Sequence, residues 1–225
     1  FPLTYAEAKG LAELAEAKNL ILFEAITNQY NPNYEKVREL LPKVGDVKIV
    51  QLNYSQYSSR YDAFKQGIVA PVFDAEKAGG ALMDLNVYNI HFVTGLFGEP
   101  KAVHYYPNME RGVDTSGILV MEYPSFQCVC IAAKDCGAPL SVNIEGDKGC
   151  IFSHSNAGRF EEFSFQENKK ESEHFSLIQE DGPIFYDELR AFTDYWVKDD
   201  REAFRQRLAQ SLVVMKVLDQ ARGIK

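Results

Sequence analysis

The stretch GGALMDLNVYNIH, at positions 79–91, follows two glycines with an apolar run that carries polar groups at helical spacing. Asp84, Tyr88 and His91 stand at i, i+4 and i+7, so one face of a helix would present a carboxylate, a phenol and an imidazole. The apolar positions between them would bury the other faces. Spacing alone leaves two interpretations open, a core helix with satisfied polar residues or a helix that carries chemistry.

The chain ahead of this stretch predicts two helices and two strands. Thr4 and Glu7 form a Thr-x-x-Glu capping box, which predicts a helix near the start. The continuous apolar run at 20–23 predicts a strand buried on both faces. An Asn-Pro start and a glycine stop predict a helix over 32–45, and alternation of apolar and polar residues predicts a half-exposed strand over 46–57.

The region after position 101 reads as a block of strands separated by turn residues. The expected strands are 102–106, 116–123, 127–133, 140–145, 150–154 and 159–165. Two helices follow, of which the second is expected to be capped by Asp199 with Glu202 and to end at Gly223. A block of strands with helices before and after predicts an α+β fold, with a largely antiparallel open sheet and helices on one face.

The expected strands carry apolar residues on both of their sides, as in 118–121 and 126–131. A sheet covered on one face only should alternate more cleanly between apolar and polar positions. The chain offers too few helices to cover both faces. We therefore expect a homodimer in which the second subunit covers the other sheet face.

Composition narrows the classes of partner. The 225 residues are 46% hydrophobic and carry a net charge of -8, which disfavours nucleic acid and anionic membrane surfaces. No apolar run of about 18 residues occurs. The four cysteines show neither a Cys-x-x-Cys pair nor zinc-type spacing, which favours buried thiols in a reducing cytoplasm and no metal site: Cys128, Cys130, Cys136 and Cys150.

The stretch at 79–91 resembles the Gly-Gly-x-Leu-x-Asp-x-Gly-x-Tyr/His signature of the Gfo/Idh/MocA oxidoreductases, in the version that ends in tyrosine. The sequences at 96–100 (LFGEP) and 112–115 (GVDT) are similar to that family as well. One residue departs from the signature, because Asn86 stands where the family usually has glycine. A side chain at this position would narrow the substrate site.

The resemblance implies an NAD(P)-dependent oxidoreductase acting on CH–OH groups of a small, sugar-, polyol- or dihydrodiol-like molecule. It makes Tyr88 the general acid/base and Asp84 the residue that orients the substrate or a catalytic lysine. In the family this lysine comes from a Glu-Lys-Pro sequence outside these residues, and its ammonium would bring the tyrosine pKa down. Weaker candidates for the wall of the substrate pocket are Arg60, Tyr57, Asn86 and His91.

The resemblance also implies a division of the chain. No G-x-G-x-x-G phosphate loop occurs, so residues 1–28 are expected to be the last αβ unit of a nucleotide-binding (Rossmann) domain. Residues 29–225 are expected to be the C-terminal α+β domain for substrate binding and dimerisation. NAD or NADP would bind the full-length protein, whereas this fragment would hold no cofactor and have no activity of its own.

Two alternatives to an enzyme stay open. Some relatives are non-catalytic, ligand-sensing regulators, and the chain could also serve only as a dimerisation domain. The Asp84 and Tyr88 pair argues for the enzyme. The sequence leaves the substrate and the choice between NAD and NADP undetermined.

Overall fold

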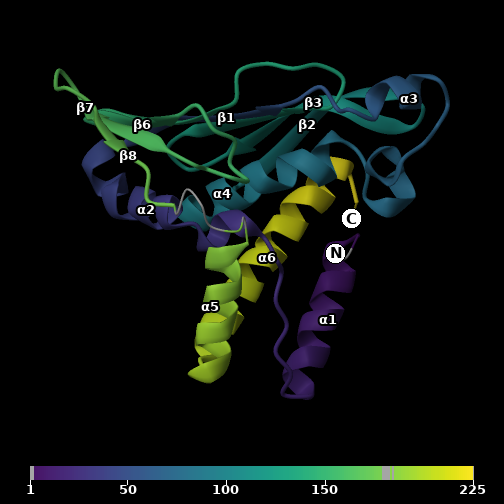
Figure 1. The fold of residues 1–225 in the computed structure, drawn as a ribbon, viewed down its shortest axis with the longest axis horizontal. Coiled ribbons are helices and arrows are strands. Elements are labelled where there is room, and N and C mark those ends of the chain that lie inside the picture. Colours follow the sequence, from purple (N-terminus) through teal and green to yellow (C-terminus); the bar gives the residue numbers. More distant parts are fainter. Residues whose placement is uncertain (1–2, 179–182, 184, 225) are drawn as a thin grey trace.

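The computed structural model describes residues 3–178, 183 and 185–224, in which one face of an open sheet is covered by helices (Figure 1). The eight strands lie in the order β2-β3-β4-β1-β5-β6-β7-β8. Only β1 and β4 pair in parallel, and the other neighbours are antiparallel. This confirms the predicted α+β class. The strands are β1 (Val47–Ser55), β2 (Ala102–Glu110), β3 (Val113–Glu122), β4 (Gln127–Ala133), β5 (Ser141–Gly146), β6 (Gly149–Ser153), β7 (Phe163–Glu167) and β8 (Glu173–Phe175).

Two layers of helices lie below the sheet in Figure 1. Helices α2, α4 and part of α6 pack directly under it, whereas α1, α5 and the other end of α6 project away from it. Short 3-10 turns lie at 27–30, 71–73 and 75–77. The helices are α1 (Tyr5–Ala17), α2 (Pro32–Val44), α3 (Tyr61–Lys65), α4 (Val87–Phe97), α5 (Tyr186–Val197) and α6 (Arg201–Arg222).

The core forms between the lower sheet face and α2, α4 and α6. Alternate residues of β1 and β4 point into it, among them Val50, Leu52, Cys128 and Cys130, all of them buried. The side chains of α4 and α6 that meet them are Ile90, Phe92, Val93, Val214, Met215 and Leu218. This burial of apolar surface is the main force that places α4, and with it the stretch at 79–91, against the sheet.

Local signals fix several helix ends as expected. Thr4 and Glu7 form both hydrogen bonds of the capping box of α1. The Asn31 side chain caps α2, whose first residue is Pro32, and Gly45 follows its last residue with a positive φ of 81°. These ends depend on contacts within a few residues, and sequence spacing therefore reveals them.

The cap of α6 differs from the expectation. The Oδ1 atom of Asp200, not a group of Asp199, accepts from the Ala203 N–H at 3.0 Å. Asp199 has a φ of 48°, so the chain turns at this residue and the next aspartate reaches the free N–H groups. Among the cysteines, Cys128 and Cys130 are buried as expected, but Cys150 is half-buried and Cys136 is exposed.

Two expected strands also differ. Residues 20–23 form an extended connection rather than a strand, and Leu20 is 63% exposed, because none of the described strands lies beside this run to pair with it. The strand expected over 159–165 begins only at Phe163. Ahead of it, Asn31 and Asn33 donate side-chain hydrogen bonds of 2.8–2.9 Å to the carbonyls of residues 159–161, which holds this segment as a loop against α2.

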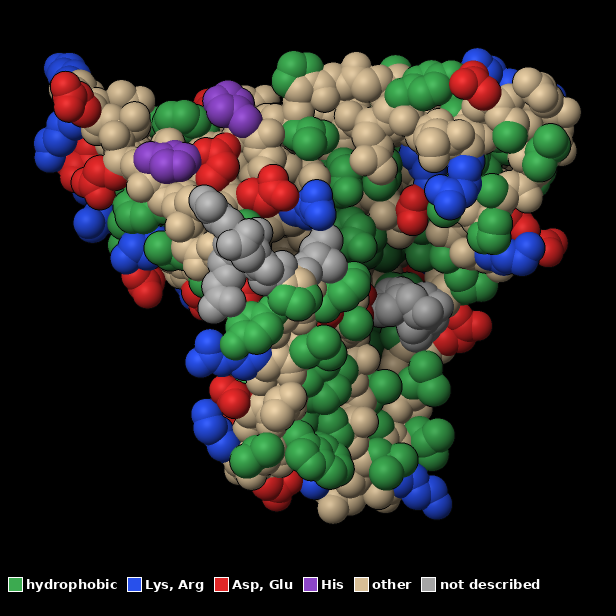
Figure 2. Space-filling model, in the orientation of Figure 1, with side chains coloured by type: hydrophobic (Ala, Val, Ile, Leu, Met, Phe, Trp, Pro, Cys, Tyr) green, Lys and Arg blue, Asp and Glu red, His purple; other side chains and the backbone are tan. Residues whose placement is uncertain are grey.

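Apolar side chains gather on the surface of the projecting helices, as Figure 2 shows. Those that are well exposed on α1 and α5 include Leu11, Leu14, Leu189, Trp196 and Val197. Among the described residues, no helix has both the length and the apolar character that a membrane crossing needs.

The buried tyrosines make the stability of the fold sensitive to alkaline pH. Burial raises the pKa of Tyr34, Tyr105 and Tyr123 above its value in the unfolded chain, about 10. The unfolded chain therefore loses these protons first, and the free energy of unfolding falls as pH rises beyond about 10. Urea unfolding between pH 8 and 11 should show this decline, and Tyr123→Phe should make it less steep. An equally steep decline in that variant would contradict the assignment.

Candidate active site

The glycine pair lies where the chain has no room for a side chain. A Cβ atom on Gly79 would lie 2.5 Å from the backbone nitrogen of Asp74 and 2.7 Å from the Pro71 carbonyl oxygen. Gly80 has a φ of 109°, and a Cβ atom there would lie 2.0 Å from the Asp114 Oδ1 atom. Both positions therefore require glycine for steric reasons, and at Gly80 the backbone conformation requires it as well.

Asp114 explains the close approach at Gly80. Its Oδ2 atom accepts from the Leu82 N–H at 2.7 Å and from the Tyr105 hydroxyl at 2.6 Å. The carboxylate thus satisfies a free backbone donor at the start of the following helix. Burial raises the pKa of Asp114. The motif at 112–115 therefore supplies the carboxylate that caps the helix, and the motif at 79–91 supplies the helix start that it caps.

The helix begins with a π-helical turn at Leu82–Asn86 and continues as α4. The Val87 N–H donates to the Leu82 carbonyl, which is the i→i+5 bond of such a turn. π turns often occur at functional sites because they redirect side chains relative to a regular helix. Asp84 lies within this turn and Tyr88 just after it, and both are half-buried.

Asp84 is paired inside the chain. The Nζ atom of Lys134, which directly follows β4, donates to the Asp84 Oδ2 atom and to the Val72 carbonyl at 2.9 Å. No hydrogen bond from a described residue reaches the Asp84 Oδ1 atom. One carboxylate oxygen is therefore held, and the other is free to accept a hydrogen bond from a bound molecule.

The Tyr88 ring lies among other parts of the chain that border the site. The ring of Tyr54, on β1, has its centroid 6.2 Å away, and Gly158 approaches so closely that a Cβ atom there would lie 3.1 Å from the Tyr88 ring. Burial raises the pKa of the Tyr88 phenol, and the carboxylates of Asp84, Glu188 and Glu24 raise it further. A lysine next to Tyr88 would lower this pKa instead of raising it. In the part of the chain that the structure describes, the ammonium group of Lys134 contacts Asp84 and not Tyr88.

His91 is fully buried rather than presented beside Tyr88. Its Nδ1 atom lies 2.9 Å from the Gln29 amide nitrogen and its Nε2 atom 3.2 Å from the Glu24 Oε1 atom. With Gln29 as donor, the neutral tautomer carries its proton on Nε2 and donates it to Glu24. His91 is thus a buried residue whose ring contacts Gln29 and Glu24. This agrees with the first interpretation of the helix, a core position with satisfied polar groups.

Asn86 is also fully buried. Its Nδ2 atom donates to the Cys130 carbonyl at 3.2 Å, and its Oδ1 atom accepts from the Asn89 side chain at 2.9 Å. The side chain points to β4 and not to Asp84 and Tyr88. The expected narrowing of a substrate site by this side chain does not occur in this structure.

Tyr57 and Arg60 are exposed at the start of α3. The Tyr57 hydroxyl donates to the Asp62 Oδ1 atom at 2.7 Å and accepts from Lys65 at 3.2 Å. In the described part of the chain, no hydrogen bond or ion pair connects either residue to Asp84 or Tyr88. The structure therefore brings Asp84 and Tyr88 together but does not join the four weaker candidates to them.

Three residues of the site did not emerge from the sequence: Lys134, Tyr54 and Glu24. Lys134 had a usable signal, because it is a charged residue that directly follows the apolar run 128–133. Its partner is 50 positions away, so spacing could not identify it.

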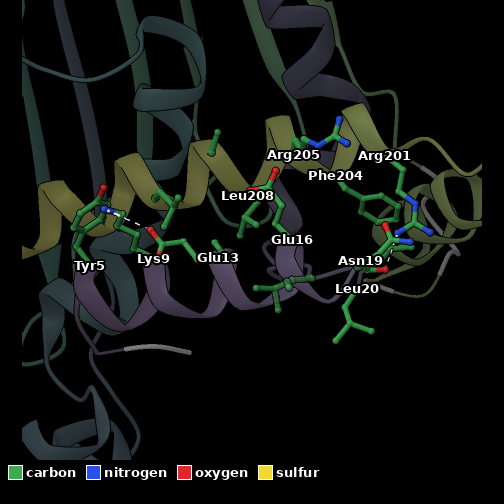
Figure 3. Close-up of a pocket in the computed structure, with 16 residues that line it drawn as sticks. Tyr5, Lys9, Glu13, Glu16, Asn19, Leu20, Arg201, Phe204, Arg205 and Leu208 are labelled. Atoms are coloured by element: carbon green, nitrogen blue, oxygen red, sulfur yellow. Dashed lines mark hydrogen bonds and ion pairs between the residues drawn. The ribbon is translucent and has the colours of Figure 1, made fainter.

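One hollow of the surface lies away from these residues. A groove of about 410 Å³ runs between α1 and the first half of α6, as Figure 3 shows. Tyr5, Lys9 and Glu13 line one side of it, and Arg201 and Phe204 line the other. Neither Asp84 nor Tyr88 borders it. The candidate site is therefore defined by its polar side chains and not by this groove.

The glycine cap yields a stability prediction. Gly80→Ala should lower the free energy of unfolding by more than about 1 kcal/mol, because alanine is strained at this φ and its methyl group meets Asp114. Gly10→Ala is the matched control: a Cβ atom at this helical position meets nothing within 4 Å, and it should leave stability unchanged or raised. Urea unfolding of the two variants checks this, and equal stability would refute the cap.

Comparisons with known proteins agree with this architecture. A family model described as the GFO/IDH/MocA C-terminal domain matches residues 34–152, more than half of the chain. The NADP-dependent scyllo-inositol 2-dehydrogenase IolU of Bacillus subtilis is 29% identical over 219 residues, which cover 96% of this chain and 66% of that protein. Trans-1,2-dihydrobenzene-1,2-diol dehydrogenase of Sus scrofa is 27% identical over 154 residues, 64% of this chain and 42% of that protein.

Solved structures share the fold. KijD10, a 3-ketoreductase from Actinomadura kijaniata in complex with NADP and TDP-benzene, superposes with a TM-score of 0.79 at 18% identity and covers 98% of this chain and 67% of its own. The chain thus spans about two thirds or less of the curated relatives' length. Since the family model matches most of the sheet and the site helix, this chain belongs to the Gfo/Idh/MocA family and carries its C-terminal domain.

Proposed function

We propose that the full-length protein is an NADP-dependent oxidoreductase that transfers a hydride to or from a hydroxyl-bearing carbon of a sugar, a polyol or a dihydrodiol-like molecule. The names of the relatives support this: they act on inositol, on a dihydrodiol and, in Hypocrea jecorina, on D-xylose with NADP. The observation that carries the proposal is the half-exposed pair of Asp84 and Tyr88 on successive turns of one helix.

Tyr88 is the proposed proton donor. Hydride transfer to a carbonyl carbon leaves an oxygen that must gain a proton, and hydride removal from an alcohol requires the reverse. Since burial and three carboxylates raise the pKa of Tyr88, its phenol keeps its proton at neutral pH and can donate it. This charge state suits the reduction of a carbonyl group directly.

Asp84 is proposed to orient the substrate. Its Oδ2 atom is held by Lys134, and its Oδ1 atom accepts no hydrogen bond from a described residue. A carboxylate oxygen next to a phenol can accept from a second hydroxyl group of the same molecule. A polyol carries such a second hydroxyl beside the reacting one, which fits the substrate class.

The nicotinamide cofactor would supply or accept the hydride. Acceptor atoms without a partner are buried around the site helix, namely Asn28 Oδ1, Gln29 Oε1 and Glu24 Oε2. Asn28 also donates to the Tyr88 carbonyl at 2.8 Å, so these acceptors lie next to the helix. A carboxamide is a donor that fits them. The chain has no glycine-rich phosphate loop, so we expect that these 225 residues alone do not bind the dinucleotide measurably.

The upper face of the sheet is proposed to bind a second copy of this chain. Its outward positions on β1, β2 and β3 include Ile49, Tyr106 and Ile118, which are 47%, 63% and 45% exposed. In the register of the sheet, Ile118 pairs with Tyr106 on one side and with Ile131 on the other, so these three apolar residues form a continuous row. A second copy would cover this row with the same surface.

The role of Tyr88 can be tested in the full-length enzyme in the reducing direction, with NADPH and the ketone derived from scyllo-inositol. Tyr88→Phe should lower turnover by about two to four orders of magnitude, because it removes the proton that the reaction moves. Tyr61→Phe is the matched control, since its hydroxyl donates to Glu110 at 2.7 Å and it is none of the candidate site residues, and its turnover should stay within about twofold of the wild type. Wild-type turnover in Tyr88→Phe would exclude Tyr88 from the reaction.

The assembly can be tested by light scattering at micromolar concentration. We expect about twice the 25.5 kDa mass of the chain. Ile118→Glu should give the monomer mass, because it places a charge in the apolar row. Ile68→Glu, at a loop position that is 64% exposed and outside the sheet, should stay dimeric. A monomeric wild type would refute the proposed face.

A further inference from the structure

Lys134 is the only buried lysine or arginine among the described residues, with 2% of its surface exposed. Its backbone is fixed on both sides: its N–H donates to the Thr115 carbonyl at 2.7 Å, and its carbonyl accepts from the Ser58 N–H at 2.9 Å. An ammonium group is costly to bury unless it is paired and hydrogen-bonded. Its position therefore has to be explained by what it contacts.

The ammonium group joins two segments of the site. One is the π-helical turn, through Asp84, and the other is the connection at 58–78, through the Val72 carbonyl. The same carbonyl accepts from the Gly80 N–H at 3.0 Å. The Phe73 ring covers the ammonium group from 5.0 Å. Lys134 thus binds both the site carboxylate and the loop that shapes the turn before it.

The two partners of the ion pair differ in exposure. The Lys134 side chain is 2% exposed, whereas the Asp84 side chain is 39% exposed. Water could solvate Asp84 without a partner, but it could not reach the ammonium group. The ion pair therefore mainly fixes the orientation of the Asp84 carboxylate. Its Oδ2 atom is held by Lys134, and its Oδ1 atom faces the open side.

The geometry points to Lys134 as a positioning residue that orients Asp84 for the bound substrate. This inference rests on the proposed function, and it assigns the task of holding the carboxylate to a lysine of this domain. Lys134 itself touches neither Tyr88 nor an open surface, so it acts through Asp84. A purely structural ion pair is the competing explanation, and it predicts a loss of stability with no dependence of activity on the pair.

A double-mutant cycle in the full-length enzyme separates the two explanations, with NADPH and the ketone derived from scyllo-inositol as probes. Lys134→Met should lower kcat/KM by roughly 10- to 100-fold, because a misdirected carboxylate holds the substrate poorly. In the Asp84→Asn background the same change should cost less than about threefold. Lys134→Arg, which keeps the positive charge, should recover part of the loss only while Asp84 is present. An undiminished further loss in the Asp84→Asn background would overturn the inference.

Lys77→Met is the matched control. Lys77 belongs to the same connection between β1 and the site helix and pairs with Asp74 at 2.7 Å, but its side chain is 63% exposed. Its replacement should leave kcat/KM within about twofold of the wild type. Thermal unfolding provides a second control: Asp84→Asn should lower the melting temperature more than Lys134→Met, because it leaves the buried ammonium group unpaired.

Crystal structures of the 225-residue chain test the orientation without any activity. In Lys134→Met the Asp84 carboxylate should leave its wild-type position by more than about 1 Å, whereas in Lys77→Met it should stay. An unmoved carboxylate in Lys134→Met would overturn the inference even if the enzyme were active. If the wild-type enzyme reduced no such ketone while the carboxylate moved as expected, the proposed function would fail and the orienting role of Lys134 would stand.

Discussion

The contact between the Asp114 carboxylate and the start of the site helix is the constraint on which the rest of the site depends. It requires a glycine at position 80, because a Cβ atom there would lie 2.0 Å from an oxygen of Asp114. It sets where the π-helical turn begins, since the Leu82 N–H donates to the same carboxylate at 2.7 Å. It also ties the helix to the start of β3, where Asp114 is the second residue. The places of Asp84 and Tyr88 follow from that start.

The charges around the helix are mostly negative, and they favour the protonated form of the Tyr88 phenol. Asp84, Glu24 and Glu188 all raise the pKa of its phenol, in addition to the larger effect of burial. The ammonium group of Lys134 pairs with the Asp84 carboxylate and does not contact Tyr88. The phenol therefore keeps its proton at neutral pH, as the proposed role of proton donor requires. Oxidation of an alcohol would need a positive charge near the ring to stabilise the phenolate.

Sequence reasoning succeeded where the cause of a structure is local and failed where it is a distant contact. The capping box at Thr4, the cap at Asn31 and the paired face of Asp84 and Tyr88 all depend on spacings of up to four residues. The partners of Lys134 and His91 lie 50 and more positions away, so no periodicity reveals them. The apolar run at 20–23 has the composition of a buried strand, but a strand also needs neighbours, and composition cannot supply them.

Asn86 illustrates how a departure from a family signature can strengthen a site instead of reshaping it. Its amide donates to the Cys130 carbonyl, and Asn89, one turn later, donates to the Ile131 carbonyl, each at 3.2 Å. With Asp114 at its start and the buried Lys134 on Asp84, the helix is thus tied to β3, to β4 and to the residue that follows β4. A glycine at position 86 would lack one of these bonds. Because catalytic groups act well only when their supports hold them within a fraction of an ångström, this added bond favours a site that is rigid before the substrate arrives.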